Sequence, residues 1–339
     1  MPNDLEDSSI KFIPDIDHDL LAGLLRGEVV IFVGNGVSRL GGVPSWDDLA
    51  TSFWKDCFDQ GFVNFATYNR LKNELKDPLE LLSICSEKLG SAYLATELKN
   101  KLYIPDEKRK KLNKIYGYIR DFQAGYVTTN YDSGLEDAQL TQEDISQDEE
   151  TLRDKLKEIP KRLTRVELNN SFKDHKNKIA YLHGSASLPT EHGIENKIIL
   201  TLPDYIRHYR EKQPGNGKCF LENLFKKTCL FIGYGLKEQE ILQHLVTPGE
   251  PVTHYLLQGL FSDEQCILKE YERFYQSIHV KLIPYNLSER GYAQLEEVLQ
   301  SWSRTFRQAK IDYYKKRIQR DEDAKNLCLI QEQNNEAFK

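Results

Sequence analysis

One stretch near the N-terminus constrains the fold more than any other: an apolar run that ends in two glycines. Residues 29–33 are β-branched or aromatic throughout, and Gly34 and Gly36 follow them closely. Such a run predicts a strand that is buried on both faces, as in a parallel sheet. The glycines predict a tight turn where the backbone can approach a ligand. Ser45 then predicts the N-cap of a helix over residues 45–60.

This junction between strand and turn predicts a nucleotide site, and a purely structural turn is an equal alternative from these residues alone. In open parallel sheets, ligands bind beyond the carboxyl ends of the strands, where such turns lie. The stretch has neither the third glycine of the dinucleotide-binding fingerprint nor the lysine of a P-loop. The junction therefore indicates a place for a site without identifying the ligand.

Composition and charge exclude several classes of protein. The chain has 339 residues, enough for one large α/β domain or two smaller ones. Its net charge of −6 gives no basis for expecting direct nucleic-acid binding. The apolar runs are too short to cross a bilayer and the first residues are acidic and polar, so we expect a cytoplasmic protein with no membrane segment. The six cysteines are widely spaced, so we expect no zinc module and no metal.

Strand-like and helical segments alternate along the rest of the chain. After the first strand, further strands are expected near residues 126–127, 178–182, 198–201, 228–232, 254–257 and 280–285. Helices are expected between them, including one over residues 238–245, and an amphipathic helix is expected over residues 292–306. This alternation predicts an α/β fold with a doubly wound, Rossmann-like parallel sheet.

Three segments differ from this pattern. Residues 62–112 contain leucines at helical spacing and predict a small helical module inserted between two strands. Residues 136–177 are strongly charged with helical periodicity and predict a solvated helical insertion. Residues 307–339 predict a charged helical tail, which either contacts a partner or is simply solvated. The main domain is therefore expected over residues 1–306.

Polar side chains follow two of the predicted strands. Asn130 and Asp132 come after the strand that begins at Tyr126, and His183 comes directly after residues 178–182. Polar groups at the carboxyl ends of buried strands face the ligand crevice of an α/β sheet, and a histidine there can serve as a general base or contact a ribose. The alternatives are a strand that simply reaches solvent and a histidine that only packs.

The strand-end motifs together resemble the sirtuin (SIR2-like) family. Residues 34–38, Gly-Asn-Gly-Val-Ser, resemble its nucleotide turn, and residues 128–132, Thr-Thr-Asn-Tyr-Asp, are similar to its Thr-Gln-Asn-hydrophobic-Asp signature. Residues 182–184, Leu-His-Gly, look like its catalytic His-Gly. Residues 200–205 and 231–236 resemble the bacterial branch found in anti-phage defence.

The resemblance implies a Rossmann-like NAD⁺ fold with a helical small domain, and it implies roles for individual residues. In that family, the positions of Asn130 and His183 are required to break the nicotinamide–ribose bond, and Asp132 would bind the nicotinamide end. The other implied NAD⁺-binding residues are Gly34, Gly36 and Ser38 at the pyrophosphate and adjoining ribose, Gly233 and Tyr234 near the adenosine half, and Asn35 and Thr129.

Departures from the sirtuin deacylases favour the defence branch. The chain lacks their four-cysteine zinc module, and Ser45-Trp46-Asp47 stands where they have Asp-Phe-Arg. Asn35 stands where alanine is usual, so it either bonds a phosphate oxygen or reshapes the pocket. The implied activity is hydrolysis of NAD⁺ to ADP-ribose and nicotinamide, which depletes NAD⁺ in abortive anti-phage defence. NAD⁺ is then the substrate, and no metal is involved.

Two other functions stay open at this point. One is a protein-modifying enzyme, either a sirtuin-type deacylase or an ADP-ribosyltransferase. The other is a non-catalytic module that binds NAD or ADP-ribose within a larger complex. For the defence branch we expect regulation by assembly, through a homo-oligomer, a separately encoded partner such as a HerA-type ATPase or an Argonaute-like protein, or a phage-derived trigger.

Overall fold

The computed structural model of the chain describes residues 10–75, 77–138, 163–168, 172, 175–186, 198–210, 215–246 and 251–337. For residues 318 and 321–337 it describes the backbone alone. Most of the charged insertion that was predicted over residues 136–177 lies outside these described residues.

The described residues form a sheet of seven strands around which the molecule is built. The strands are β1 (Val30–Val33), β2 (Gly125–Thr128), β3 (Thr164–Arg165), β4 (Lys178–Tyr181), β5 (Cys229–Ile232), β6 (His254–Leu260) and β7 (Val280–Asn286). Their order is β3-β4-β2-β1-β5-β6-β7, and every neighbouring pair is parallel. Strands β2, β3 and β4 lie on one side of β1 and strands β5, β6 and β7 on the other, so the topological switch point lies between β1 and β5. The prediction of a doubly wound, Rossmann-like α/β fold is confirmed.

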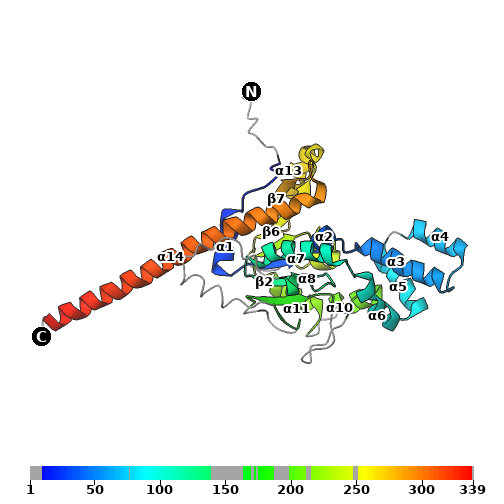
Figure 1. Cartoon of the computed structure of the whole chain (residues 1–339), viewed down its shortest axis with the longest axis horizontal. Coiled ribbons are helices and arrows are strands. Elements are labelled where there is room, and N and C mark those ends of the chain that lie inside the picture. The colour runs from blue at the N-terminus through cyan, green and yellow to red at the C-terminus, as the bar shows by residue number, and fades with distance from the viewer. Residues whose placement is uncertain are drawn as a thin grey trace, which may run out of the picture.

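Helices cover both faces of the sheet (Figure 1). One face carries α1 (His18–Arg26), α7 (Asp106–Arg120) and α14 (Gln294–Ala337), and the other carries α10 (Leu202–Arg210), α11 (Gly217–Leu224) and α13 (Leu268–Gln276). The short elements are α2 (Asn35–Leu40), α8 (Gly134–Asp137), α12 (Gln239–Leu242) and the 3₁₀ helices η1 (Ser262–Ile267) and η2 (Gly291–Ala293).

Strand β1 lies in the middle of this arrangement. Ile31 and Val33 pack with α1, α7 and α14, whereas Val30 and Phe32 pack with α10 and α11. Successive side chains of a strand point to opposite faces, and all four of these side chains are fully buried. The prediction of a strand buried on both faces is confirmed, and it explains why the apolar run is unbroken.

The two Gly-rich turns at the switch point pack directly on each other. The backbone N–H of Gly36 donates to the carbonyl oxygen of Gly233 at 2.8 Å, and that of Gly34 donates to the carbonyl oxygen of Ile232 at 2.9 Å. A Cβ atom on Gly34 would lie 2.5 Å from the Gly233 oxygen, and one on Gly36 would lie 2.7 Å from it. Gly233 also has a φ of +61°. Close backbone contact therefore requires glycine at these positions.

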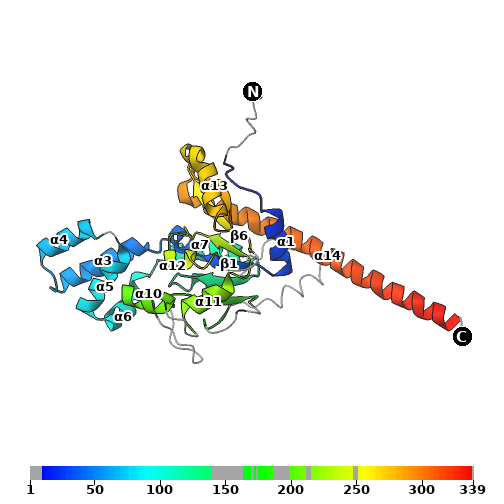
Figure 2. The same cartoon turned by 180° about the vertical axis from the view of Figure 1, so that it is seen from behind.

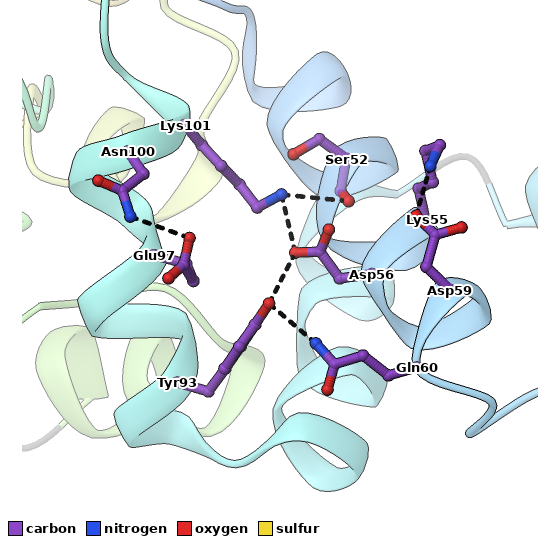
Figure 3. Close-up of polar contacts among 9 residues, drawn as sticks. All are labelled: Ser52, Lys55, Asp56, Asp59, Gln60, Tyr93, Glu97, Asn100 and Lys101. Carbon is purple, nitrogen blue, oxygen red and sulfur yellow. Dashed lines mark hydrogen bonds and ion pairs between the residues drawn. The ribbon is translucent and has the colours of Figure 1, made fainter.

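A helical module lies at the opposite end of the molecule from the C-terminus (Figures 1 and 2). It consists of α3 (Trp46–Asp59), α4 (Phe65–Glu74), α5 (Pro78–Leu89) and α6 (Ser91–Lys101), which share an apolar cluster of their own. The half-buried ammonium of Lys101 pairs with Asp56 at 2.8 Å, and the hydroxyl of Tyr93 donates to the same carboxylate at 3.5 Å (Figure 3). These contacts join α6 to α3, so α3 packs with the helices of residues 62–112.

The predicted N-cap of α3 is confirmed. The backbone N–H of Asp48 donates to the Ser45 hydroxyl oxygen at 3.1 Å, and the Ser45 N–H donates back to the Asp48 carboxylate at 3.1 Å. This reciprocal capping box satisfies two backbone donors at the start of the helix. It fixes the direction in which the chain leaves the turn after β1.

Several predicted elements differ from the structure. Residues 198–201 form no strand: Ile199 and Leu200 are buried in two different apolar clusters, so burial without strand pairing explains the apolar run. The expected helix over residues 238–245 is only the four-residue α12. The turn after β1 contains the short helix α2, which was not predicted.

Helix α14 is also longer than the amphipathic helix predicted over residues 292–306. It continues without a break to Ala337 and projects away from the body (Figure 2). Among the described residues, no helix is long and apolar enough to cross a membrane.

We predict that Gly34→Ala lowers the free energy of unfolding by about 2 kcal/mol, because its Cβ meets a backbone that cannot move aside. The matched control is Gly235→Ala in the turn after β5, where the nearest atom to the added Cβ lies 3.7 Å away. Urea titration of both variants measures the difference. Equal losses of stability in the two would contradict the glycine contact.

Candidate active site

The residues that the sequence predicted as a site follow four adjacent strands of the sheet. Gly34, Asn35, Gly36 and Ser38 follow β1, Thr129, Asn130 and Asp132 follow β2, His183 follows β4, and Gly233 and Tyr234 follow β5. The spatial order of these strands is β4-β2-β1-β5. Because all four are parallel, their carboxyl ends meet at one edge of the sheet.

Three of these residues form a polar cluster through direct hydrogen bonds. The Asn130 side-chain amide donates to the Ser38 hydroxyl oxygen at 2.9 Å, and the Ser38 hydroxyl donates to the Asp132 carboxylate at 2.8 Å. The backbone N–H of Asn130 donates at 3.0 Å to the Thr128 hydroxyl, which itself donates to the Val33 carbonyl at 2.8 Å. The ends of β1 and β2 therefore hold the asparagine from both sides.

Tyr116 completes the polar cluster, and the sequence reasoning missed it. Its hydroxyl lies 2.8 Å from the Ser38 hydroxyl, donates to Asp132 at 3.3 Å and accepts from the Asn130 amide at 3.5 Å. Tyr116 comes from α7, where it occupies a buried position next to Ile115. In the sequence it is an ordinary apolar-face residue of a helix, and no motif distinguishes it.

Burial affects two members of the polar cluster, Asp132 and Asn130. Burial raises the pKa of Asp132, and hydrogen bonds from Ser38, the Gly134 backbone and Tyr116 oppose this rise. The side-chain oxygen of Asn130 is buried and has no hydrogen-bond partner among the described residues. An unsatisfied buried acceptor costs about 1–3 kcal/mol, so this oxygen is suited to receive a donor from a ligand.

His183 lies in an aromatic chamber whose walls are the rings of Tyr131, Tyr205 and Tyr209. The imidazole is 2% exposed. Its Nε2 lies 2.6 Å from the Tyr209 hydroxyl, and its Nδ1 lies 3.2 Å from the Tyr205 hydroxyl. Burial lowers the pKa of His183 well below its usual value, with a smaller effect from nearby His208, so the imidazole is neutral.

The N-terminus of α10 explains how the two tyrosines reach His183. The hydroxyl of Thr201 donates to the Asp204 carboxylate at 2.6 Å, and the backbone N–H of Asp204 donates to the Thr201 oxygen at 3.4 Å. This arrangement caps the helix and fixes the position of Tyr205. The ring of Trp46, at the start of α3, stacks on Tyr131 with 5.6 Å between centroids. The helical module thus contributes to the chamber.

Glu238 is a second residue that the sequence reasoning did not assign to the site. Its Oε2 atom lies 4.0 Å from Nε2 of His183, while its side chain as a whole is 31% exposed. Burial of the carboxyl raises the pKa of Glu238 to about 7, against the lowering effect of the Tyr234 hydroxyl. From the sequence, Glu238 was predicted only to be the first residue of a helix.

A cavity of about 250 Å³ opens beside Asp132, between the α6–α7 connection and the loop after β2. The polar side chains that line it include Lys99, Arg109, Asn113, Asp132 and Asp137. Pockets for drug-sized ligands are usually about 300–1,000 Å³, so this cavity suits one ring or sugar of a larger ligand. Its position places such a ring against the polar cluster.

Residues 124–256 match the protein-family model described as the SIR2-like domain. The part of the chain that this model matches is a SIR2-like domain. The matched residues include β2, β4 and β5, and with them Asn130, Asp132 and His183. Comparison with curated proteins gives no match. SIR2-like domains use NAD⁺.

Other residues that the resemblance assigned to NAD⁺ binding have structural contacts within the protein. The backbone N–H groups of Gly34 and Gly36 are already bonded across the switch point. The Asn35 amide donates to the Pro44 carbonyl at 3.3 Å. Tyr234 is buried against the ring of Phe32, with 4.8 Å between centroids, and Thr129 is half-buried. Their roles toward NAD⁺ stay predictions.

The site therefore consists of two parts at one edge of the sheet. The polar cluster offers a buried amide oxygen and a carboxylate that lines a cavity, and the aromatic chamber holds a neutral imidazole. Among the described residues, no group of three or more His, Cys, Asp or Glu side chains is placed to hold a metal ion.

We predict that Tyr116→Phe lowers the free energy of unfolding by about 1–2 kcal/mol, because it removes a buried hydroxyl shared by three partners. The matched control is Tyr118→Phe on the same helix. The Tyr118 hydroxyl is buried without a hydrogen-bond partner among the described residues, so its loss should be neutral or stabilising. Urea unfolding of both proteins measures this, and a larger loss in Tyr118→Phe would contradict the assigned contacts.

Proposed function

We propose that this SIR2-like chain is an NAD⁺ glycohydrolase that converts NAD⁺ and water to ADP-ribose, nicotinamide and a proton. The observation that carries the proposal is the buried, unpartnered oxygen of Asn130, which belongs to the same polar cluster as Asp132 at the wall of the cavity. That pairing occurs within the matched SIR2-like domain, at the strand ends that bind ligands in this fold class.

The chemistry of the reaction fits these residue types. Nicotinamide leaves as a neutral molecule, so the transition state carries positive charge on the ribose ring. Such a reaction needs held ribose hydroxyls, a positioned water and a modest base. The amide oxygen of Asn130 can accept from a ribose hydroxyl or the water, and the carboxylate of Asp132 can stabilise the developing charge.

The cavity beside Asp132 is large enough for the nicotinamide ring and too small for the whole dinucleotide. In this proposal it receives the leaving group, and the rest of NAD⁺ extends along the carboxyl ends of β1 and β5. The neutral imidazole of His183 can accept a proton, which a charged imidazolium could not.

The enclosure of His183 supports a resting state of low activity. Both ring nitrogens are bonded to tyrosines of α10, so the histidine cannot contact a substrate until one of these contacts changes. This geometry supports control by a trigger, and the resemblance to the defence branch supports depletion of NAD⁺ in abortive anti-phage defence.

Assembly is the mode of control that we propose. Beyond Phe306, helix α14 projects from the body and offers a place for a homo-oligomer contact, or for a separately encoded partner such as a HerA-type ATPase or an Argonaute-like protein (Figure 1). A phage-derived trigger is the third candidate. We place the reaction in the cytoplasm, where NAD⁺ is available.

We predict that the purified protein releases nicotinamide and ADP-ribose from NAD⁺, and that Asn130→Ala and His183→Ala each lower the rate at least about 100-fold. Chromatography of the products measures both. The control is His244→Gln, a buried histidine outside the site, which should retain the wild-type rate.

If the protein is silent alone, phage lysate and the products of neighbouring genes are added. Continued silence, with NAD⁺ binding that His183→Ala leaves unchanged, would favour a non-catalytic NAD-binding module. Turnover of acylated peptides or labelling of proteins with ADP-ribose would favour a deacylase or an ADP-ribosyltransferase.

A further inference from the structure

We propose that Glu238 accepts the proton that His183 takes up and passes it to solvent. This inference rests on the proposed function and adds to it a positioning residue and a route for the proton. Hydrolysis of NAD⁺ releases one proton from the attacking water. A site that retained this proton on a buried histidine would stop after one turnover.

Burial prevents His183 from releasing its proton directly to bulk water. His183 is 2% exposed and surrounded by aromatic rings, so its imidazole has no direct contact with bulk water. Glu238 lies between this interior and the surface: its side chain is 31% exposed, and its buried Oε2 atom lies 4.0 Å from Nε2 of the histidine. The Glu238 carboxyl therefore faces the imidazole, and its side chain is partly exposed to solvent.

The groups that face the two ring nitrogens of His183 indicate the path of the proton. Nδ1 faces the Tyr205 hydroxyl, and Nε2 faces the Tyr209 hydroxyl and the Glu238 carboxylate. As the O–H bond of the water breaks and its oxygen bonds to the ribose carbon, the C–N bond electrons leave with nicotinamide. The proton enters the ring at Nδ1, the Nε2–H proton passes to Oε2 of Glu238, and the carboxylic acid then releases it to water.

The surroundings of Glu238 favour this role over a structural one. Its Oε2 atom is buried, and the neighbouring Tyr234 hydroxyl opposes the rise in the carboxyl pKa that burial causes. The separation of 4.0 Å is longer than a hydrogen bond, as catalytic contacts often are before the substrate binds.

Titration of Glu238 falls in the range that a proton relay requires. Burial raises its pKa to about 7, so the acid and the carboxylate are both populated near neutral pH. The groups that influence the two members of the relay are Tyr234 and Glu240 at the carboxylate, His208 at the imidazole, and the hydroxyls of Tyr131, Tyr205 and Tyr209 around them. Below about pH 7 the protonated acid cannot accept, so the rate should rise as the pH rises through 7.

The coupling can be measured without any turnover. Nitrogen NMR of the His183 ring, assigned by its loss in His183→Ala, should show an inflection near pH 7 as Glu238 titrates. Glu238→Gln should abolish the inflection, whereas the matched control Glu240→Gln and the variant His208→Gln should keep it. Ring signals that do not move between pH 6 and 8 in the wild type, or that move equally in Glu238→Gln, would overturn the proposal.

Kinetics then test the relay in the reaction itself. Glu238→Gln should lower kcat at least about 10-fold, leave KM for NAD⁺ within about twofold, and flatten the pH profile. Glu238→Asp should restore part of the rate, and Glu240→Gln should keep a pH-dependent rate, with the profile moved to lower pH because Glu240 raises the pKa of Glu238. A wild-type rate and pH profile in Glu238→Gln would overturn the relay. If the wild type cleaves no NAD⁺ but the NMR inflection is present, the proposed function fails while the coupling of Glu238 to His183 stands.

Discussion

The contact between the two glycine turns at the switch point is the constraint on which the site depends. The bond from Gly36 to Gly233 joins the ends of β1 and β5 with no side chain between them. Ser38 follows the turn after β1 and belongs to the polar cluster, and Glu238 follows the turn after β5 and lies at the aromatic chamber. A side chain at either glycine would separate the two turns. The glycines are therefore accounted for by the fold, and any role toward a phosphate is additional to that.

Hydrogen bonding divides the site into satisfied and unsatisfied groups. Ser38, Asp132 and Tyr116 bond to one another, so this part of the site is held rigidly before any ligand arrives. The oxygen of Asn130 and one oxygen of Glu238 are left without partners among the described residues. Buried polar atoms without partners are uncommon in folded proteins, and both of these lie at the same edge of the sheet. The stability lost there is consistent with a site built for a ligand.

The sequence predicted the frame of this protein better than the interior of its site. Hydrophobic period and strand-end polarity are local properties, so β1, the cap at Ser45 and the grouping of Asn130 with Asp132 could be inferred. Tyr116 and Glu238 reach the site only through the tertiary packing of their segments, and local sequence patterns do not predict such packing. The short helix α2 was missed because its glycine disfavours helix, and tertiary contacts override that preference. Residues 198–201 were wrongly predicted as a strand because burial between clusters and burial in a sheet produce the same apolar run.

Under the proposed function, the contacts that prepare His183 for chemistry also keep it from the substrate. Burial among the tyrosines of α10 makes the imidazole neutral, and the same tyrosine hydroxyls occupy both of its nitrogens. A ligand or partner can shift this arrangement only by binding the open form more tightly than the closed one. Each hydroxyl contact is worth about 1 kcal/mol, so loss of the Tyr205 contact is a small cost for an oligomer interface to offset. Activation therefore needs only a change in how α10 packs, and no refolding of the sheet that carries the site.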